Sequence, residues 1–295
     1  TKILKALFSM VSRLSLPGAL ALGRGFGWLY GSVIRYHRRD AFLALRRSFP
    51  EKSEKEIRQI VRRMYRNLGM NFVELCRLTV MTQEDLKNLV TMDGEEIVLE
   101  ALKQKKGVIF LSAHLGNWDM LCSFAPRWGY PLTIITKNIK NKALNEYWMD
   151  IRQRFGLRFL PAHNSYRACL SALRKNELIG FILDQNMIRD EGVFVDFFGK
   201  PACTTPGLAY MSAQSGAPVI PAFMIRESEG RHRVKILPAL APPSDRKPET
   251  IHQATQEYTR IIEQMIREHP DQWIWIHRRW RTTVPPAETT PVAPG

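Results

Sequence analysis

The sequence GVIFLSAHLGNWD, residues 107–119, begins with a short apolar run and ends with polar groups. The run from Val108 to Leu111 follows a lysine-rich segment and Gly107, a pattern that predicts a buried strand. His114 and Asp119 come just after the point where this strand would end. Open α/β sheets bind their ligands at the carboxyl ends of strands. We therefore predict that this imidazole and this carboxylate belong to a functional site.

The residues between His114 and Asp119 allow the two side chains to meet. Gly116 and Asn117 permit a sharp turn that would bring the carboxylate back to the imidazole. We interpret the pair as a His–Asp dyad that deprotonates a hydroxyl for acyl transfer. The alternative is structural: a histidine that precedes a helix and an aspartate in the first turn of that helix.

Composition limits the class of protein. The chain has 295 residues, 45% of them hydrophobic, and 43 basic against 28 acidic residues give a formal net charge of +15. Such a charge favours an anionic partner: nucleic acid, anionic lipid, a phosphorylated substrate or an acidic carrier protein. The four cysteines show neither Cys-x-x-Cys nor zinc-site spacing, which is typical of reduced thiols in a cytosol-facing protein. We expect no metal site and no cofactor.

Residues 1–49 form a basic, apolar segment that we predict to associate with a membrane. Its most apolar part, from Leu14 to Ile34, is flanked on both sides by lysine or arginine. No stretch reaches 18 apolar residues without a charge, so we expect no clean transmembrane helix. The pattern suits a membrane interface or a weak anchor. The alternative is a pair of amphipathic helices packed on the core.

Residues 50–283 alternate between predicted strands and helices, which indicates an α/β domain with a mixed, mostly parallel sheet. Ser53 and Glu56 have the spacing of a helix capping box. Residues 284–295 are rich in proline, threonine and alanine and are predicted to be disordered. Strands are expected at 108–111, 132–136, 157–160, 178–183, 193–199, 217–224, 233–237 and 273–276, and helices at 141–155, 166–175, 206–214 and 250–269.

Polar residues follow three of these predicted strands. His114, Lys137 and Asp184 each come directly after a strand. If those strands are adjacent and parallel, the three side chains share one crevice. The predicted helix at 141–155 adds two cations near it, Arg152 and Arg154.

The sequence also resembles a known family, the lipid A biosynthesis acyltransferases, which include lauroyl and myristoyl transferases within the glycerolipid acyltransferase superfamily. The resemblance covers nearly the whole chain in order. It rests on HLGNWD (114–119), TKN (136–138), RQRFG (152–156), LDQ (183–185), GVFVDFFG (192–199), TTPG (204–207), GAPVIP (216–221) and WIWIHRRW (273–280).

The resemblance implies transfer of a fatty acyl chain from an acyl carrier protein thioester to a hydroxyl of a lipid A precursor. It implies the cytoplasmic face of a bacterial inner membrane, with an anionic membrane surface and a phosphorylated glycolipid as partners. His114 would be the general base and Asp119 its partner. The residues expected to bind the acceptor are Gly116, Asn117, Lys137, Asn141, Arg152, Asp184 and Gln185.

Three other functions stay open at this point. A related acyltransferase could use a phospholipid or glycolipid acceptor, with acyl-CoA as donor. A thioesterase could use the same dyad to activate water. A nucleic-acid binder would explain the charge, but the chain lacks a Gly-rich phosphate loop and an RNA-binding aromatic motif. A serine hydrolase is disfavoured because there is no Gly-x-Ser-x-Gly motif.

Overall fold

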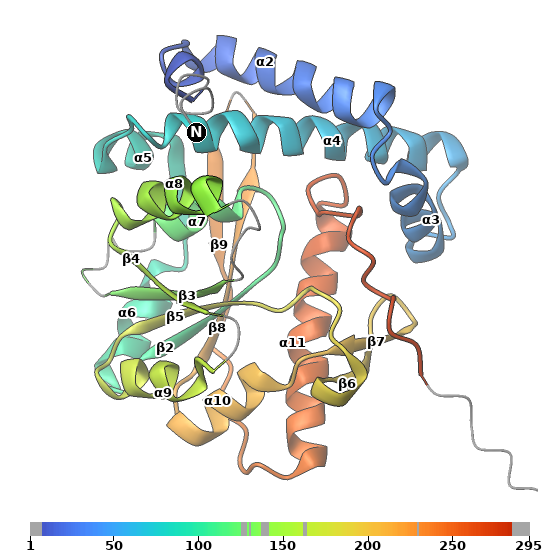
Figure 1. Cartoon of the computed structure of the whole chain (residues 1–295). Helices are drawn as coiled ribbons and strands as arrows, with labels where there is room; N and C mark the ends of the chain where they lie inside the picture. Colours follow the sequence, from blue (N-terminus) through green and yellow to red (C-terminus); the bar gives the residue numbers. More distant parts are fainter. Residues whose placement is uncertain are drawn as a thin grey trace, which may run out of the picture.

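A seven-stranded sheet forms the centre of the molecule (Figure 1). The computed structural model describes residues 8–124, 129, 131–136, 142–161, 164–228 and 230–284. The strands are β1 (Val90–Asp93), β2 (Val108–Ser112), β3 (Leu132–Thr136), β4 (Leu157–Pro161), β5 (Leu178–Ile182), β6 (Val193–Asp196), β7 (Pro201–Thr204), β8 (Val219–Arg226) and β9 (His232–Ile236). Across the large sheet their order is β1-β9-β8-β2-β5-β3-β4, and β6 and β7 form a separate hairpin.

Every neighbouring pair in the large sheet is parallel except β8 and β9. The predicted mixed, mostly parallel sheet is thus confirmed. The described helices are α2 (Leu16–Trp28), η1 (Leu29–Val33, a π-helix), α3 (Arg38–Ser48), α4 (Glu54–Arg77), α5 (Gln83–Leu89), α6 (Glu95–Lys103), α7 (Trp118–Phe124), α8 (Lys142–Gln153), α9 (Tyr166–Arg174), η3 (Arg189–Glu191), α10 (Gly207–Ser215) and α11 (Pro248–Glu268). The predicted capping box of Ser53 and Glu56 begins α4. Residues 285–295 of the predicted tail lie outside the described residues.

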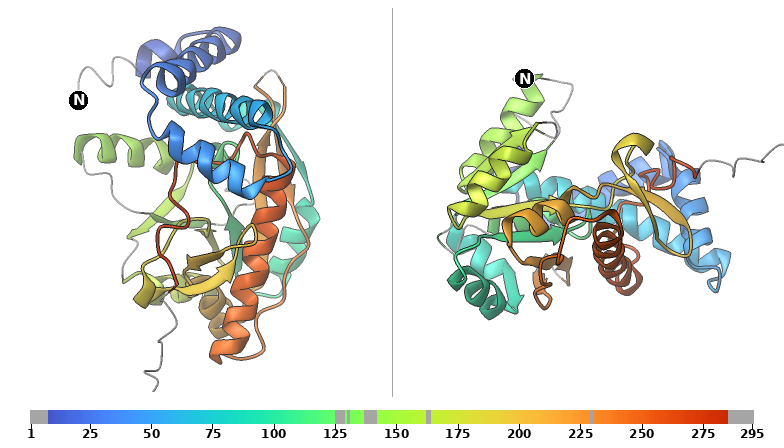
Figure 2. Two further views of the ribbon diagram at one scale, coloured as in Figure 1. Left: turned by 90° about the vertical axis from the view of Figure 1, so that its right-hand side faces the viewer. Right: turned by 90° about the horizontal axis from the view of Figure 1, so that it is seen from below.

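The central strand β2 is buried on both faces, as its unbroken apolar sequence predicts. Because successive side chains of a strand point to opposite faces, it contributes to two cores. Ile109 and Leu111 pack in the core formed with α9, α10 and α11. Val108 and Phe110 pack in the core formed with α6, α7 and α8. In the left view of Figure 2 the blue N-terminal helices lie at the top, and α11, in orange-red, runs down beside the strands of the sheet.

One predicted strand does not form. The alternating run from Trp273 to Ile276 predicted a last strand, but the structure has turns there and a single bridge to Leu115. Both tryptophans of the run are almost wholly buried, with their rings edge to face at 4.6 Å, and Trp275 also contacts Phe198. The alternation therefore reflects two large side chains packed in an aromatic cluster, and it does not reflect a pleated strand.

Helix α2 packs closely along α4, and glycines make this possible. A Cβ at Gly27 would lie 2.1 Å from the carbonyl oxygen of Tyr65, and one at Gly69 would lie 2.1 Å from that of Gly23. Larger residues would force the two backbones apart. Residues 16–33 thus pack along α4. Among the described residues, no helix has both the length and the hydrophobicity needed to cross a bilayer.

Candidate active site

The parallel register of β2 and β5 brings His114 and Asp184 together. Ser112 at the end of β2 lies opposite Ile182 at the end of β5, so both polar residues are two positions beyond the last pair. His114 Nδ1 lies 2.8 Å from Asp184 Oδ1, and the backbone N–H of His114 donates to Asp184 Oδ2, also at 2.8 Å. The prediction that polar residues after neighbouring strands converge is confirmed for these two side chains.

Asp184 is fixed by more than the histidine. Its Oδ2 also accepts a hydrogen bond of 2.7 Å from the indole N–H of Trp273, and only 2% of the residue is exposed. Asp184 therefore lies behind the imidazole and holds it; it does not face the cleft as the predicted acceptor ligand would. In a neutral His114, the Nδ1 proton donates to Asp184 and leaves Nε2 as a hydrogen-bond acceptor.

The charges of this pair shift both pKa values. Burial lowers the pKa of His114, but the negative charge and hydrogen bond of Asp184, with a smaller effect of Asp119, outweigh it and raise the pKa above its ordinary value. Burial raises the pKa of Asp184, but the His114 charge and the hydrogen bonds of His114 and Trp273 lower it to about 2. Asp184 is thus ionised at neutral pH.

Asp119 does not make the predicted hydrogen bond to His114. It lies in the first turn of α7, and its carboxylate accepts a hydrogen bond from the guanidinium of Arg152 on α8. That guanidinium also lies 5.0 Å from the ring centre of Trp148 and 5.8 Å from that of Phe159. The carboxylate that bonds the imidazole is instead that of Asp184, because the parallel register places it beside His114 after β5.

A cleft of about 620 Å³ opens in front of these groups. His114, Asp119, Arg152 and Gln185 supply polar atoms to its wall, and the Gln185 amide nitrogen lies 3.4 Å from His114 Nε2. The buried Nε atom of Arg152 has no hydrogen-bond partner among the described residues. The other residues that line the cleft are Trp118, Cys122, Ile134, Ile135, Thr136, Leu157, Phe159, Phe181, Ile182, Leu183, Asn186, Met187, Ile188, Glu191 and Thr205.

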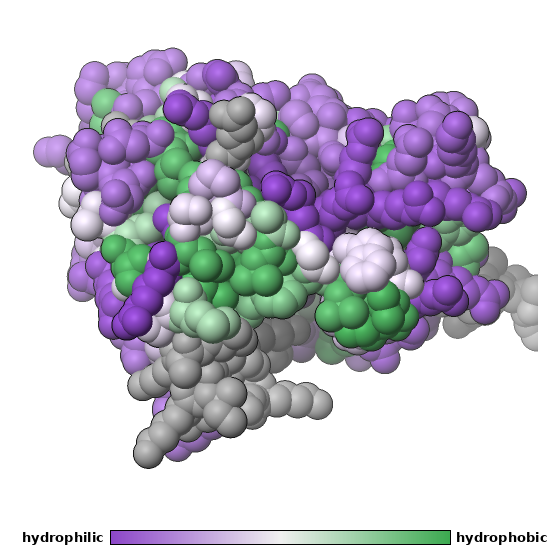
Figure 3. All heavy atoms as spheres, turned by 90° about the horizontal axis from the view of Figure 1, so that it is seen from above, coloured by the Kyte–Doolittle hydropathy of each residue, from purple (hydrophilic) through white to green (hydrophobic). Residues whose placement is uncertain are grey.

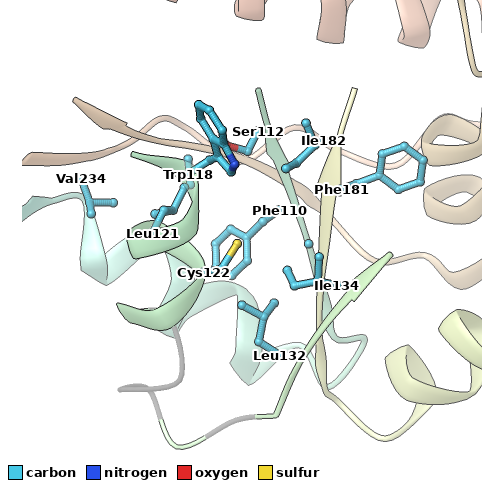
Figure 4. A pocket seen from close by; sticks show the side chains of 12 residues that line it. Phe110, Ser112, Trp118, Leu121, Cys122, Leu132, Ile134, Phe181, Ile182 and Val234 are labelled. Atoms are coloured by element: carbon cyan, nitrogen blue, oxygen red, sulfur yellow. The ribbon is translucent and has the colours of Figure 1, made fainter. Parts of the chain in front are cut away.

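A smaller cavity, almost entirely apolar, adjoins this cleft (Figure 4). The two share wall residues, among them Trp118, Cys122 and Phe181. The cavity continues between β2, β3 and α7, where Phe110, Leu121 and Leu132 line it. The cleft therefore has polar groups around His114 and apolar residues on the side that it shares with this cavity.

The other predicted acceptor residues have different positions. Gly116 and Asn117 are not among the described residues that line the cleft. Gly116 has φ +59°, and a Cβ there would lie 1.7 Å from the carbonyl oxygen of Met224, so the loop must pass close to β8. Arg154 donates to the carbonyl oxygen of Thr79 at an exposed position. The predictions for Lys137 and Asn141 fall outside the described residues.

Asn117 instead joins a buried polar network beneath the loop. Its amide donates to Glu74 of α4 at 2.6 Å, and its Oδ1 accepts from the backbone N–H of Met120 at 3.1 Å. Glu74 also accepts hydrogen bonds from Arg226 and is within 3.1 Å of His232 Nε2. Burial raises the pKa of Glu74, but the interactions with Arg226 and His232 lower it to about 2.

A second side chain of α4, Asn71, connects the same network to the loop. Asn71 donates to the carbonyl oxygen of Gly116 at 2.6 Å and accepts from Arg226 at 2.7 Å. The loop between His114 and Asp119 is therefore positioned by residues far away in the sequence. Sequence reasoning missed Glu74, Arg226 and Trp273; a lone acidic residue on the apolar face of a predicted helix was the available signal for Glu74.

Replacing Glu74 with glutamine should strongly destabilise the protein. Breaking a buried ion pair leaves an uncompensated charge, here on Arg226, at a cost of roughly 3–5 kcal/mol. Urea unfolding measures the change. The control is Glu100→Gln, which removes an exposed ion pair with Lys103 and should change stability little. Equal stability of Glu74→Gln and the wild type would contradict the proposed importance of the network.

Comparison with known proteins gives the family of the chain. Residues 3–282 match the family described as bacterial lipid A biosynthesis acyltransferase. The chain is 28% identical over 256 residues to a lipid A biosynthesis acyltransferase of Haemophilus influenzae, covering 86% of this chain and 79% of that one. It is 26% identical over 260 residues to the lipid A biosynthesis myristoyltransferase of Escherichia coli, covering 88% and 80%. It is 28% identical over 280 residues to the palmitoleoyltransferase of Escherichia coli, covering 92% and 87%.

The relatives are named as acyltransferases, and this is the class of enzyme that the comparison gives for the mixed, mostly parallel sheet with its His–Asp pair beside a cleft. The match over almost the whole length shows that the chain belongs to the bacterial lipid A biosynthesis acyltransferase family.

Proposed function

We propose that the protein transfers a fatty acyl chain from the thioester of acyl carrier protein to a hydroxyl of a lipid A precursor. The observation that carries the proposal is the imidazole of His114, held through Nδ1 by the buried carboxylate of Asp184, at the wall of a cleft. The relatives named as lipid A acyltransferases support the choice of acceptor. The donor follows from the resemblance and from the positive net charge, which attracts an acidic carrier protein.

In the proposed reaction His114 acts as a general base. Nε2 takes the proton of the acceptor hydroxyl while the hydroxyl oxygen attacks the thioester carbonyl. Asp184 stabilises the imidazolium that forms, as the acid does in a Ser-His-Asp triad. When the tetrahedral intermediate collapses, the C–S bond breaks and the thiolate takes the proton from Nε2. The ester and the free thiol leave a neutral histidine, and the reaction needs no cofactor.

Other side chains of the cleft have roles that follow from their chemistry. Arg152 carries a charge held in place by Asp119, and its guanidinium at the wall of the cleft can donate to an oxygen of the acceptor. The apolar cavity beside Trp118, about 40 Å³ in volume, has room for a short part of the acyl chain, and burial of each methylene group there is favourable by about 0.8 kcal/mol. Lys137 and Asn141 stay predicted acceptor ligands.

The proposed site of action is the cytoplasmic face of a bacterial inner membrane. Large hydrophobic side chains at the end of α2 and on η1, among them Trp28, Leu29 and Val33, are exposed. Exposed apolar and aromatic side chains next to basic ones are typical of proteins that bind a membrane interface.

Mass spectrometry of reaction products tests the proposal. The protein is supplied with a fatty acyl thioester of carrier protein or of CoA, and with a lipid A precursor, a phospholipid or water as acceptor. The expected result is an acylated lipid A precursor, formed faster from the carrier-protein thioester. Acyl transfer to phospholipid alone would favour a related acyltransferase, and free fatty acid formed at the same rate without any lipid would favour a thioesterase.

Arg152→Ala should raise the KM for a phosphorylated acceptor and leave the KM for the acyl donor nearly unchanged. One lost hydrogen bond to a charged group costs roughly 1.5–3 kcal/mol, which corresponds to a rise of about 10- to 150-fold. Steady-state kinetics with phosphorylated and dephosphorylated acceptors measure the effect. Arg154→Ala is the matched control, since Arg154 is absent from the described cleft lining. An equal effect on both acceptors would contradict the role.

A further inference from the structure

An arginine-lined groove lies between η1, α3 and α4, apart from the catalytic cleft. It consists of two neighbouring hollows of about 450 and 270 Å³ that share Arg38 and Val61. No acidic residue is part of either lining. The lining arginines are Arg35, Arg38, Arg39, Arg58, Arg62 and Arg66.

Most of these arginines lack a carboxylate partner. Arg58 pairs with Glu54. The other five make no ion pair with any residue in the described part of the chain. Guanidinium groups that lie close together without counter-charges repel one another, and a bound anion would reduce this electrostatic repulsion. Arginine is well suited to phosphate because its planar fork can donate two parallel hydrogen bonds.

The backbone around the groove is held in place. The π-helix η1 and Gly31 bring the chain against the ring of Tyr65, and the hydroxyl of Tyr65 donates to the carbonyl oxygen of Tyr36. His37 bonds to Asp40 at 2.8 Å at the start of α3. These contacts position the arginines of α3 opposite those of α4.

The rim of the groove is apolar and exposed. Six large side chains next to it have exposed fractions between 38% and 59%: Trp28, Leu29, Tyr30, Val33, Ile34 and Tyr36. Figure 3, which views the side of the molecule where α2 and α4 lie, shows hydrophobic surface bordered directly by strongly hydrophilic surface. The acyl region of a bilayer can bury these apolar side chains, whereas the polar surface of an acidic protein cannot.

We propose that this groove binds the phosphate headgroup of an anionic phospholipid while the rim inserts into the membrane interface. The proposal deepens the membrane association proposed above by assigning it a headgroup site. The site is separate from His114, so its occupation orients the protein on the bilayer without taking part in acyl transfer.

Vesicle binding by a charge-matched pair of variants tests the proposal. The groove variant is Arg38→Gln/Arg62→Gln/Arg66→Gln. The control variant is Arg167→Gln/Arg174→Gln/Arg246→Gln, which removes three exposed arginines on and near α9 and α11, at the other end of the molecule (Figure 1). Both lower the net charge by three. Binding is measured by co-sedimentation with phosphatidylcholine vesicles with and without phosphatidylglycerol.

The groove variant should bind phosphatidylglycerol vesicles about 100-fold more weakly than the wild type, from about fivefold for each arginine near an anionic surface. It should keep the wild-type affinity for neutral vesicles, and the control variant should lose clearly less. Equal losses in the two variants would overturn the proposal in favour of unspecific attraction. Inorganic phosphate can be added as a competitor in this assay. If it released the protein from the vesicles at a concentration as low as that of the anionic lipid, the lipid would be overturned as the occupant of the groove.

Two further measurements separate this proposal from the others. Acyl transfer to a detergent-dispersed acceptor should be unchanged in the groove variant, so its failure in vesicle binding does not depend on the proposed reaction. Binding to an acidic carrier protein is measured in the same variants. Loss of that binding with unchanged binding to vesicles would show that the groove is a protein-docking site and overturn the proposal.

Discussion

Replacing His114 with alanine is expected to lower the rate of acyl transfer by about 10²–10⁴-fold, the usual contribution of a general base. The fold should stay intact, because the imidazole lies at the wall of the cleft and Asp184 keeps its bonds to Trp273 and to the backbone. Single-turnover assays with a saturating acceptor measure the loss, and circular dichroism verifies the fold.

The wild-type rate should also depend on pH in one direction. A base works only when neutral, and the raised pKa of His114 means that protonation begins at a higher pH than for an ordinary imidazole. Activity should therefore fall as the pH drops through that pKa. The control is His252→Ala, which should leave the rate nearly unchanged. His252 stands as far before Glu257 in the sequence as His114 stands before Asp119, but it bonds to the carbonyl oxygen of Phe194, away from the cleft. A folded His114→Ala protein with near wild-type turnover would disprove the mechanism.

Replacing Asp184 with asparagine should have an effect of similar size, about 10²–10⁴-fold. Two donors, the backbone N–H of His114 and the indole of Trp273, both reach Oδ2. They would orient the new amide with its oxygen toward them and its NH₂ group toward the imidazole. Nδ1 must then accept a hydrogen bond, which puts the proton on Nε2, where the base needs a lone pair.

The pH profile distinguishes this role from a merely structural one. Asp184 raises the pKa of His114, so its neutralisation should move the acidic limb of the profile to lower pH while the plateau falls. Asp119→Asn should keep that limb close to its wild-type position, since Asp119 contributes less to the shift, and should act mainly through Arg152. A larger shift in Asp119→Asn than in Asp184→Asn would reverse the assignment made from the geometry.

Much of the fold can be predicted from the sequence because its elements are locally consistent. The apolar run of β2, the capping box of α4 and the amphipathic pattern of α11 each agree with their place in the structure. The run around Trp273 led to a wrong strand prediction, because alternation of apolar and polar residues indicates only that every second side chain is buried. Turns packed into an aromatic cluster satisfy the same pattern as a strand does.

The site was predicted in outline but not in its pairing. His114 and Asp184 were expected in one crevice, since each follows a strand. Choosing the carboxylate that bonds the imidazole requires the order of the strands and their register, which bring residues 70 positions apart into contact. The short spacing to Asp119 suggested a closer partner, yet Arg152 from another helix takes up that carboxylate. Such competition between distant partners is not visible in a local motif.

Helix α4 contacts both α2 and the catalytic loop, at two fixed positions along its length. Tyr65 and Gly69 receive α2, and Asn71 and Glu74 hold the catalytic loop. From Tyr65 to Glu74 the helix rises about 13 Å, at 1.5 Å per residue. Because α4 runs side by side with α2 (Figure 1), the catalytic loop keeps one fixed distance, measured along the helix, from the contact with α2. A change that kinked α4 between Tyr65 and Glu74 would therefore move the catalytic loop relative to α2 without altering any residue of the cleft.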